Sequence, residues 1–71
     1  MTVQVFQVSG MTCGHCVAAV TEEIESLPGV RAVRVDLVPG QVSDVTVDAE
    51  APLEAAAVRA AVDEAGYELV G

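Results

Sequence analysis

The side chains best suited to chemistry in this sequence lie together, because both cysteines and the only histidine fall at Cys13, His15 and Cys16. A Cys-x-x-Cys pair has two relevant uses. In a redox protein the two sulfurs exchange a disulfide, and in a metal carrier both thiolates hold one ion. Both uses need a lowered thiol pKa, which a helix start supplies through its partial positive charge and unpaired backbone N–H groups. The pattern therefore predicts a redox site or a soft-metal site.

The number of available ligands separates the possible metal sites. A closed zinc site needs four nitrogen or sulfur ligands, and a c-type haem site needs His directly after the second Cys, where this chain has Val17. An iron–sulfur cluster would need thiolates from a second chain. Cu(I) fits best, because soft thiolates select it and it accepts few ligands. Two sulfurs on an exposed loop can approach a linear S–Cu–S arrangement and pass the ion on by exchanging one thiolate at a time.

The redox alternative predicts a thiol–disulfide oxidoreductase with a thioredoxin-like fold around the motif. Here the motif follows the first expected strand of a split βαβ arrangement, and the chain has no Trp to flank it. Both features favour a metal carrier without enzymatic activity.

The residues around the cysteines have several possible roles. His15 is either an exposed loop residue, or a third or transient ligand that tunes the thiolates. Met11 could offer a thioether, but we expect it in the core, where it anchors the loop from beneath. Thr12 is expected to supply a loop or cap hydroxyl. Gly14 is expected to let the backbone curl so that both sulfurs point one way.

Hydrophobic periodicity places these residues in a regular order of elements. In the first expected strand, Val3 and Val5 share one face and Phe6 and Val8 the other, and we expect Phe6 and Val8 in the core because their face carries the largest side chain. Val42 is out of phase with later strand residues, which predicts a bulge or longer hairpin loop near residues 43–44. Pro52 suits a first helical turn and Gly66 a helix C-cap. The predicted strands are 2–9, 30–38, 41–48 and 67–70, and the predicted helices are 14–27 and 53–65.

This order is β-α-β-β-α-β, which predicts an α+β, ferredoxin-like sandwich with a four-stranded antiparallel sheet and two helices on one face. In that topology the loop before the last strand lies at the same end of the sheet as the cysteines. We therefore expect Tyr67 beside Cys13 and Cys16, where its ring would shield the metal and its hydroxyl would reach toward a sulfur.

Composition limits the possible partners. With 71 residues the chain is expected to form a single domain over residues 1–71, and its formal net charge is −8. Such acidity disfavours nucleic acid and anionic membrane surfaces. The sequence shows neither a secretory signal nor an apolar run long enough for direct membrane insertion. We therefore expect a cytoplasmic protein whose thiols stay reduced.

The stretch Gly10-Met11-Thr12-Cys13-Gly14-His15-Cys16 resembles the Gly-Met-x-Cys-x-x-Cys signature of heavy-metal-associated domains. Residues 29–30 and 65–67 are also similar to that family, and the length suits a stand-alone bacterial copper chaperone of the CopZ type. The resemblance implies Cu(I) bound by Cys13 and Cys16, and delivery to the metal-binding domains of a copper-transporting P-type ATPase. Domains excised from such ATPases look similar, and relatives carry Zn, Cd or Hg. Residues 40–47 differ from the tighter family hairpin by an apparent insertion.

Two exposed Cys-x-x-Cys loops could also share Cu(I) between chains. The sequence therefore allows a copper-linked homodimer as a second mode of metal binding.

Overall fold

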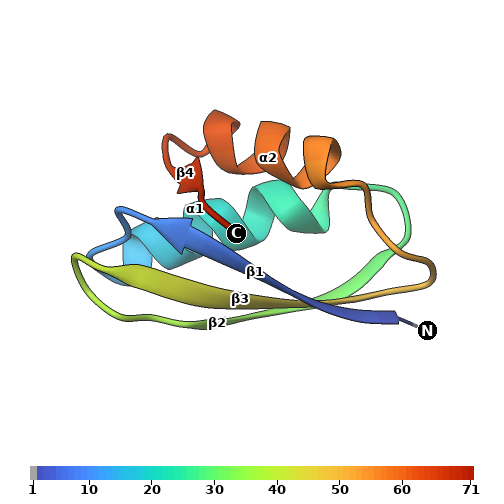
Figure 1. The fold of residues 1–71 in the computed structure, drawn as a ribbon, viewed down its shortest axis with the longest axis horizontal. Helices are drawn as coiled ribbons and strands as arrows, with labels where there is room; N and C mark the ends of the chain where they lie inside the picture. Colours follow the sequence, from blue (N-terminus) through green and yellow to red (C-terminus); the bar gives the residue numbers. More distant parts are fainter. Residues whose placement is uncertain (1) are drawn as a thin grey trace.

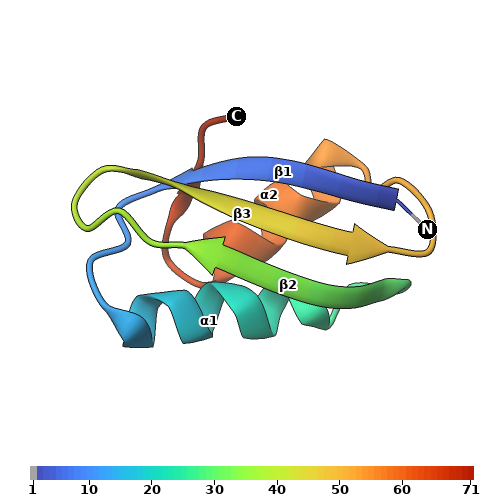
Figure 2. The ribbon, with the colours of Figure 1, turned by 90° about the horizontal axis from the view of Figure 1, so that it is seen from below.

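The fold is a four-stranded antiparallel sheet with both helices packed on one of its faces (Figure 1). It is seen in a computed structural model that describes residues 2–71. The strand order across the sheet is β2-β3-β1-β4. Figure 2 shows β2, β3 and β1 side by side from the face without helices. This arrangement confirms the predicted ferredoxin-like βαββαβ fold. The elements are β1 (Thr2–Ser9), α1 (Gly14–Glu25), β2 (Val30–Asp36), β3 (Val42–Ala49), α2 (Ala55–Glu64) and β4 (Glu68–Leu69).

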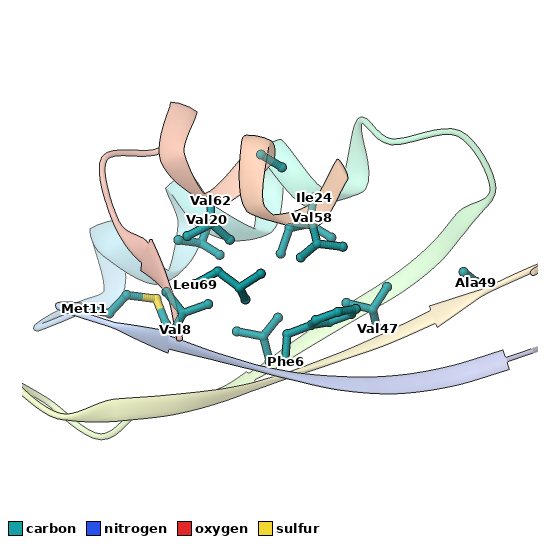
Figure 3. Packing of buried hydrophobic residues seen from close by; sticks show 12 residues of the cluster. Phe6, Val8, Met11, Val20, Ile24, Val47, Ala49, Val58, Val62 and Leu69 are labelled. Atoms are coloured by element: carbon teal, nitrogen blue, oxygen red, sulfur yellow. The ribbon is translucent and has the colours of Figure 1, made fainter. Parts of the chain in front are cut away.

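The core lies between the sheet and the two helices. Phe6 and Val8 point into it from β1, whereas Val3 and Val5 are exposed on the opposite face, as predicted. Burying one such side chain contributes about 1.5–3 kcal/mol, so this layer supplies most of the favourable free energy of folding. The helices contribute the buried stripes Val20 and Ile24 of α1, and Val58, Ala61 and Val62 of α2 (Figure 3).

Of the two irregularities predicted near residues 43–44, the bulge is wrong and the longer hairpin loop is confirmed, because pairing between β2 and β3 stops at Asp36↔Asp44. β3 pairs with β1 in unbroken register from Ser9↔Val42 to Thr2↔Ala49. Ser43 occupies a core-facing position, and its buried hydroxyl accepts a hydrogen bond from the Val38 backbone N–H at 2.9 Å. A satisfied serine therefore takes the place of an apolar residue, and Val42 faces outward without a bulge. The register shift of this sheet lies instead between Val30 and Ala32 in β2.

Several element ends differ from the prediction. Helix α2 begins at Ala55 rather than Leu53, because the backbone of Leu53 is bound to the side chain of Gln4. The Leu53 N–H donates to Gln4 Oε1 at 2.7 Å, and Gln4 Nε2 donates to the Leu53 C=O at 3.4 Å. Pro52 therefore lies before the helix and not in its first turn.

The first helix and second strand also end earlier than predicted. Ser26 is the C-cap of α1, so this helix ends at Glu25 rather than at residue 27. Strand β2 ends at Asp36, because Val38 already belongs to the turn closed by its C=O and the Gln41 N–H. Among the described residues, neither helix is long and apolar enough to cross a lipid bilayer.

Candidate metal site

The cysteine loop leaves β1 through a turn at Gly10. Its φ of +93° lies in the left-handed region, where a side chain is strained. Gly14, which was expected to provide the curl of the loop, begins helix α1 and is not among the glycines with positive φ. A Cβ added to Gly14 would have no neighbour within 4 Å. The conformational need for glycine is therefore at Gly10.

The two cysteines occupy defined positions at the start of α1. Cys13 is the N-cap residue, with extended backbone angles, and its C=O accepts hydrogen bonds from the N–H groups of Cys16 and Val17. These bonds place Cys16 in the first turn, one residue after His15. The two Sγ atoms lie 3.5 Å apart, and both cysteines are free thiols. Cys13 is exposed and Cys16 is half-buried, so one sulfur is more accessible to a partner than the other.

Hydrogen bonds toward Cys16 Sγ favour its thiolate. The Tyr67 hydroxyl has the largest effect, followed by the backbone and the hydroxyl of Thr12 and then by Cys13, and together they lower the pKa of the Cys16 thiol to about 6. Thr12 Oγ1 lies 3.7 Å from this sulfur. Because donors stabilise the charged form of a thiol, Cys16 is mostly a thiolate at neutral pH. A thiolate is the form that binds a metal ion.

Tyr67 reaches the site from the far end of the chain. Helix α2 ends in a Schellman motif, in which the Tyr67 N–H bonds to the Val62 C=O and the Gly66 N–H to the Asp63 C=O. Gly66 has a φ of +91°, as its predicted C-cap role requires, and this turn directs Tyr67 toward the cysteine loop. The interaction with Cys16 raises the pKa of the Tyr67 phenol, so the hydroxyl stays protonated and can donate.

The loop is anchored from beneath by Met11. Its side chain is fully buried, and Figure 3 shows its thioether in the core beside Val8. The Met11 C=O also accepts a hydrogen bond of 3.1 Å from the Gly40 N–H in the β2–β3 hairpin. Met11 therefore fixes the position of the loop, in agreement with its predicted place in the core.

His15 has an exposed side chain in the first turn of α1. Within residues 2–71, no group of three or more His, Cys, Asp or Glu side chains is arranged to hold a metal ion. The donor set that the structure gathers is thus the pair of sulfurs, and participation of His15 stays a prediction.

Two contributions to the site were not predicted from the sequence. The backbone of Thr12 helps to stabilise the Cys16 thiolate, and Gly40 holds the loop through Met11. Gly40 lies in the β2–β3 hairpin, and its contact with the cysteine loop joins two loops that are far apart in the sequence. No local pattern reports such a contact.

Comparison with known proteins agrees with this geometry. The heavy-metal-associated domain family matches residues 5–68. The copper chaperone CopZ of Bacillus subtilis (strain 168) is 39% identical over 69 residues, covering 97% of each chain. The copper chaperone CopZ of Staphylococcus aureus (strain MRSA252) is 34% identical over 70 residues, covering 99% of this chain and 100% of the relative.

Solved structures show the same relation. A structure described as a CopZ metallochaperone superimposes with a TM-score of 0.82 at 28% identity, covering 97% of this chain and all of the other. The family match, the two curated relatives and this structural neighbour each extend over nearly the whole length. This chain therefore belongs to the heavy-metal-associated domain family.

Proposed function

We propose that this chain is a copper chaperone that binds Cu(I) through Cys13 and Cys16. The observation that carries the proposal is the pair of sulfurs, 3.5 Å apart, at the exposed start of a helix. Thiolates are soft ligands that select Cu(I) over harder ions. The relatives named above are copper chaperones, which supports copper as the cargo.

The geometry needs only a small adjustment to hold the ion. With a metal–thiolate bond of about 2.3 Å, as in zinc sites, two sulfurs on opposite sides of an ion are about 4.6 Å apart. The sulfurs must therefore separate by about 1 Å from their present 3.5 Å. Rotation of the exposed Cys13 side chain can supply this movement, while Cys16 keeps its contacts with Tyr67 and Thr12.

We further propose that the copper is delivered to the metal-binding domains of a copper-transporting P-type ATPase. An ion held by two sulfurs can accept a third from a partner, and the accessible Cys13 is the ligand that would leave first. Such an exchange transfers the ion without chemical change, so the chain acts as a carrier and not as an enzyme. We place this function in the cytoplasm, where thiols stay reduced.

The experiment is a titration of the reduced protein with Cu(I) under anaerobic conditions, against a competing Cu(I) chelator. We expect tight one-to-one binding that is lost in Cys13→Ser and in Cys16→Ser. A parallel titration with Zn²⁺, Cd²⁺ and Hg²⁺ tests the choice of metal. Copper-loaded protein is then mixed with an isolated metal-binding domain of a copper ATPase, and the copper content of each is measured after separation.

The same sulfur geometry also favours a second candidate, a thiol–disulfide oxidoreductase, because the close pair and the lowered Cys16 pKa suit disulfide exchange. An insulin reduction assay separates the two functions. Disulfide reductase activity together with failure to compete for Cu(I) would overturn the chaperone proposal.

A further inference from the structure

The sheet has an open edge along the first half of β1. Strand β4 is only two residues long and pairs with Val8 and Ser9. The C-terminal residues make two more hydrogen bonds of 2.8 Å with Gln7. The Gln7 N–H donates to the Gly71 C=O, and the Gln7 C=O accepts from the Val70 N–H. From Gln7 toward the N-terminus, residues 2–6 pair with β3 on one side and have no strand on the other side, so this second side forms the rim of the sheet (dark blue in Figure 2).

The direction of the free backbone groups follows from Gln7. Its N–H and C=O both point toward the β4 side. Because backbone groups in a strand repeat every second residue, those of Val5 and Val3 point the same way. Within residues 2–71, no backbone hydrogen bond uses these groups on that side. Each valine therefore presents one unpaired donor and one unpaired acceptor at the rim.

The opposite edge of the sheet is protected in ways that this one is not. Strand β2 carries Arg31, Arg34 and Asp36 and contains the register shift. Charges and bulges of this kind prevent pairing with other strands. Residues 2–6 read Thr-Val-Gln-Val-Phe, without charge, Pro or Gly. Val3 and Val5 are 65% and 58% exposed, although both side chains are apolar.

We propose that this edge pairs with the same edge of a second copy of the chain. A two-fold axis through Gln4 places Val3 opposite Val5 of the second copy, and Val5 opposite its Val3. All four free groups of each rim then find partners, in four antiparallel hydrogen bonds. The valine side chains of both copies form one apolar row on the open face of the joined sheet. This self-complementarity selects a second copy over an unrelated strand.

The charge of the chain and the surface area buried between the two copies determine how stable this dimer is. The chain has a net charge of −8, but the pairing segment has no charge, so no like charges lie directly opposite each other. Repulsion between the two acidic bodies remains, and added salt should reduce it. An edge of five residues buries less than the roughly 1,000 Å² of a stable interface, so we expect a weak and rapidly exchanging dimer.

The dimer is independent of copper. Antiparallel pairing of the two β1 strands places the two cysteine loops at opposite ends of the assembly. Cys13 and Cys16 of both copies stay accessible, in contrast to a copper-linked dimer, in which the two loops must meet. The association therefore persists in a metal chelator.

The test is sedimentation equilibrium of the reduced full chain in a chelator, at concentrations up to about 1 mM, which suits interfaces of this size. We expect a concentration-dependent dimer that strengthens between about 0.05 and 0.5 M salt. Two double variants at the same positions then test the register. Val3→Lys/Val5→Lys places like charges opposite each other and should weaken the dimer roughly tenfold or more. Val3→Lys/Val5→Glu places opposite charges there and should retain it.

Val42→Lys is the matched surface control. Val42 lies on the same open face and is 43% exposed, but it belongs to the interior strand β3 and pairs with Ser9 of β1, away from the open edge. This variant should leave the dimer intact. Circular dichroism checks that each variant is folded. A monomer at all concentrations, equal dimerisation of the two double variants, or loss of the dimer in Val42→Lys would overturn the proposal.

Discussion

The two helices of this fold begin in similar ways but differ in what surrounds their first turns. Cys13 and Glu54 are both N-cap residues with extended backbone, and neither side chain makes a capping hydrogen bond. Neither first turn contains an acidic residue. Both helix starts therefore present unpaired N–H groups and a partial positive charge.

The surroundings of the two helix starts explain why only one is a candidate metal site. The start of α1 carries two sulfurs and is approached by Tyr67 and Thr12. The start of α2 carries alanines, and its approach is fixed by Gln4. A helix start alone thus provides general electrostatic support, whereas the donors that stabilise a particular thiolate come from elsewhere in the fold.

The largest expected effect comes from moving the two cysteines from the start of α1 to the start of α2. Glu54→Cys/Ala57→Cys, made in a Cys13→Ser/Cys16→Ser background, places sulfurs at the N-cap and third helical positions of α2. We expect Cu(I) binding about 10–100-fold weaker than that of the native chain, because the outer contacts are missing. Chelator competition measures it. Equal affinity at the two helix starts would mean that Tyr67 and Thr12 contribute nothing.

The next test removes the main donor to Cys16. Tyr67→Phe keeps the ring but loses the hydroxyl, so the pKa of Cys16 should rise from about 6 toward its ordinary value of 9.0. The pH dependence of alkylation, measured in a Cys13→Ser background so that one thiol reports, gives the pKa directly. An unchanged pKa would assign the thiolate's stability to the helix start rather than to Tyr67.

The same pKa shift links folding to pH. With an unfolded pKa of 9.0 and a folded pKa of about 6, the unfolded chain binds more protons between these values. The contribution of Cys16 to the free energy of unfolding is therefore full above pH 9.0, declines as the pH falls, and is lost near pH 6. Urea unfolding across this window should show the slope, and Tyr67→Phe should flatten it.

A smaller effect is expected at the start of α2. Gln4→Leu removes both hydrogen bonds to Leu53 and leaves a part-buried N–H without its partner, which should lower the free energy of unfolding by about 1–3 kcal/mol. Copper affinity should not change, because the effect is confined to the other helix start. Gln41→Leu, in an exposed turn, is the control for the loss of an amide. Equal stability of the two variants would contradict this role of Gln4.

The smallest expected effects are changes in the free energy of unfolding when two glycines of the cysteine loop, Gly10 and Gly14, are replaced by alanine. Gly10→Ala forces a side chain into a φ of +93° and should cost about 1–2 kcal/mol. Gly14→Ala adds a methyl group in open space at the first helical position and should stabilise the chain by about 0.5–1 kcal/mol. Urea unfolding of both variants measures the difference. Destabilisation by Gly14→Ala would restore the sequence-based expectation that this residue provides the curl.

The sequence predicted those features that depend on side-chain period and topology. The size of Phe6 indicated the core face of β1, and the βαββαβ order indicated that Tyr67 lies at the cysteine loop. Prediction from the sequence failed where hydrogen bonds between a side chain and the backbone of another segment determine the local structure. Gln4 contacts Leu53, 49 residues away, and delays α2. Ser43 is buried because Val38 supplies its hydrogen-bond partner, and no hydrophobic pattern marks such a polar residue as part of the core.

The central claim, that two thiolates hold Cu(I), is tested most directly by X-ray absorption at the copper edge. The protein is loaded with less than one equivalent of copper, which limits sharing of the ion between chains. We predict a Cu(I) centre with two sulfur neighbours from Cys13 and Cys16, and loss of this signal in Cys13→Ser/Cys16→Ser. A centre surrounded only by nitrogen or oxygen, or a spectrum that the double substitution leaves unchanged, would contradict the account.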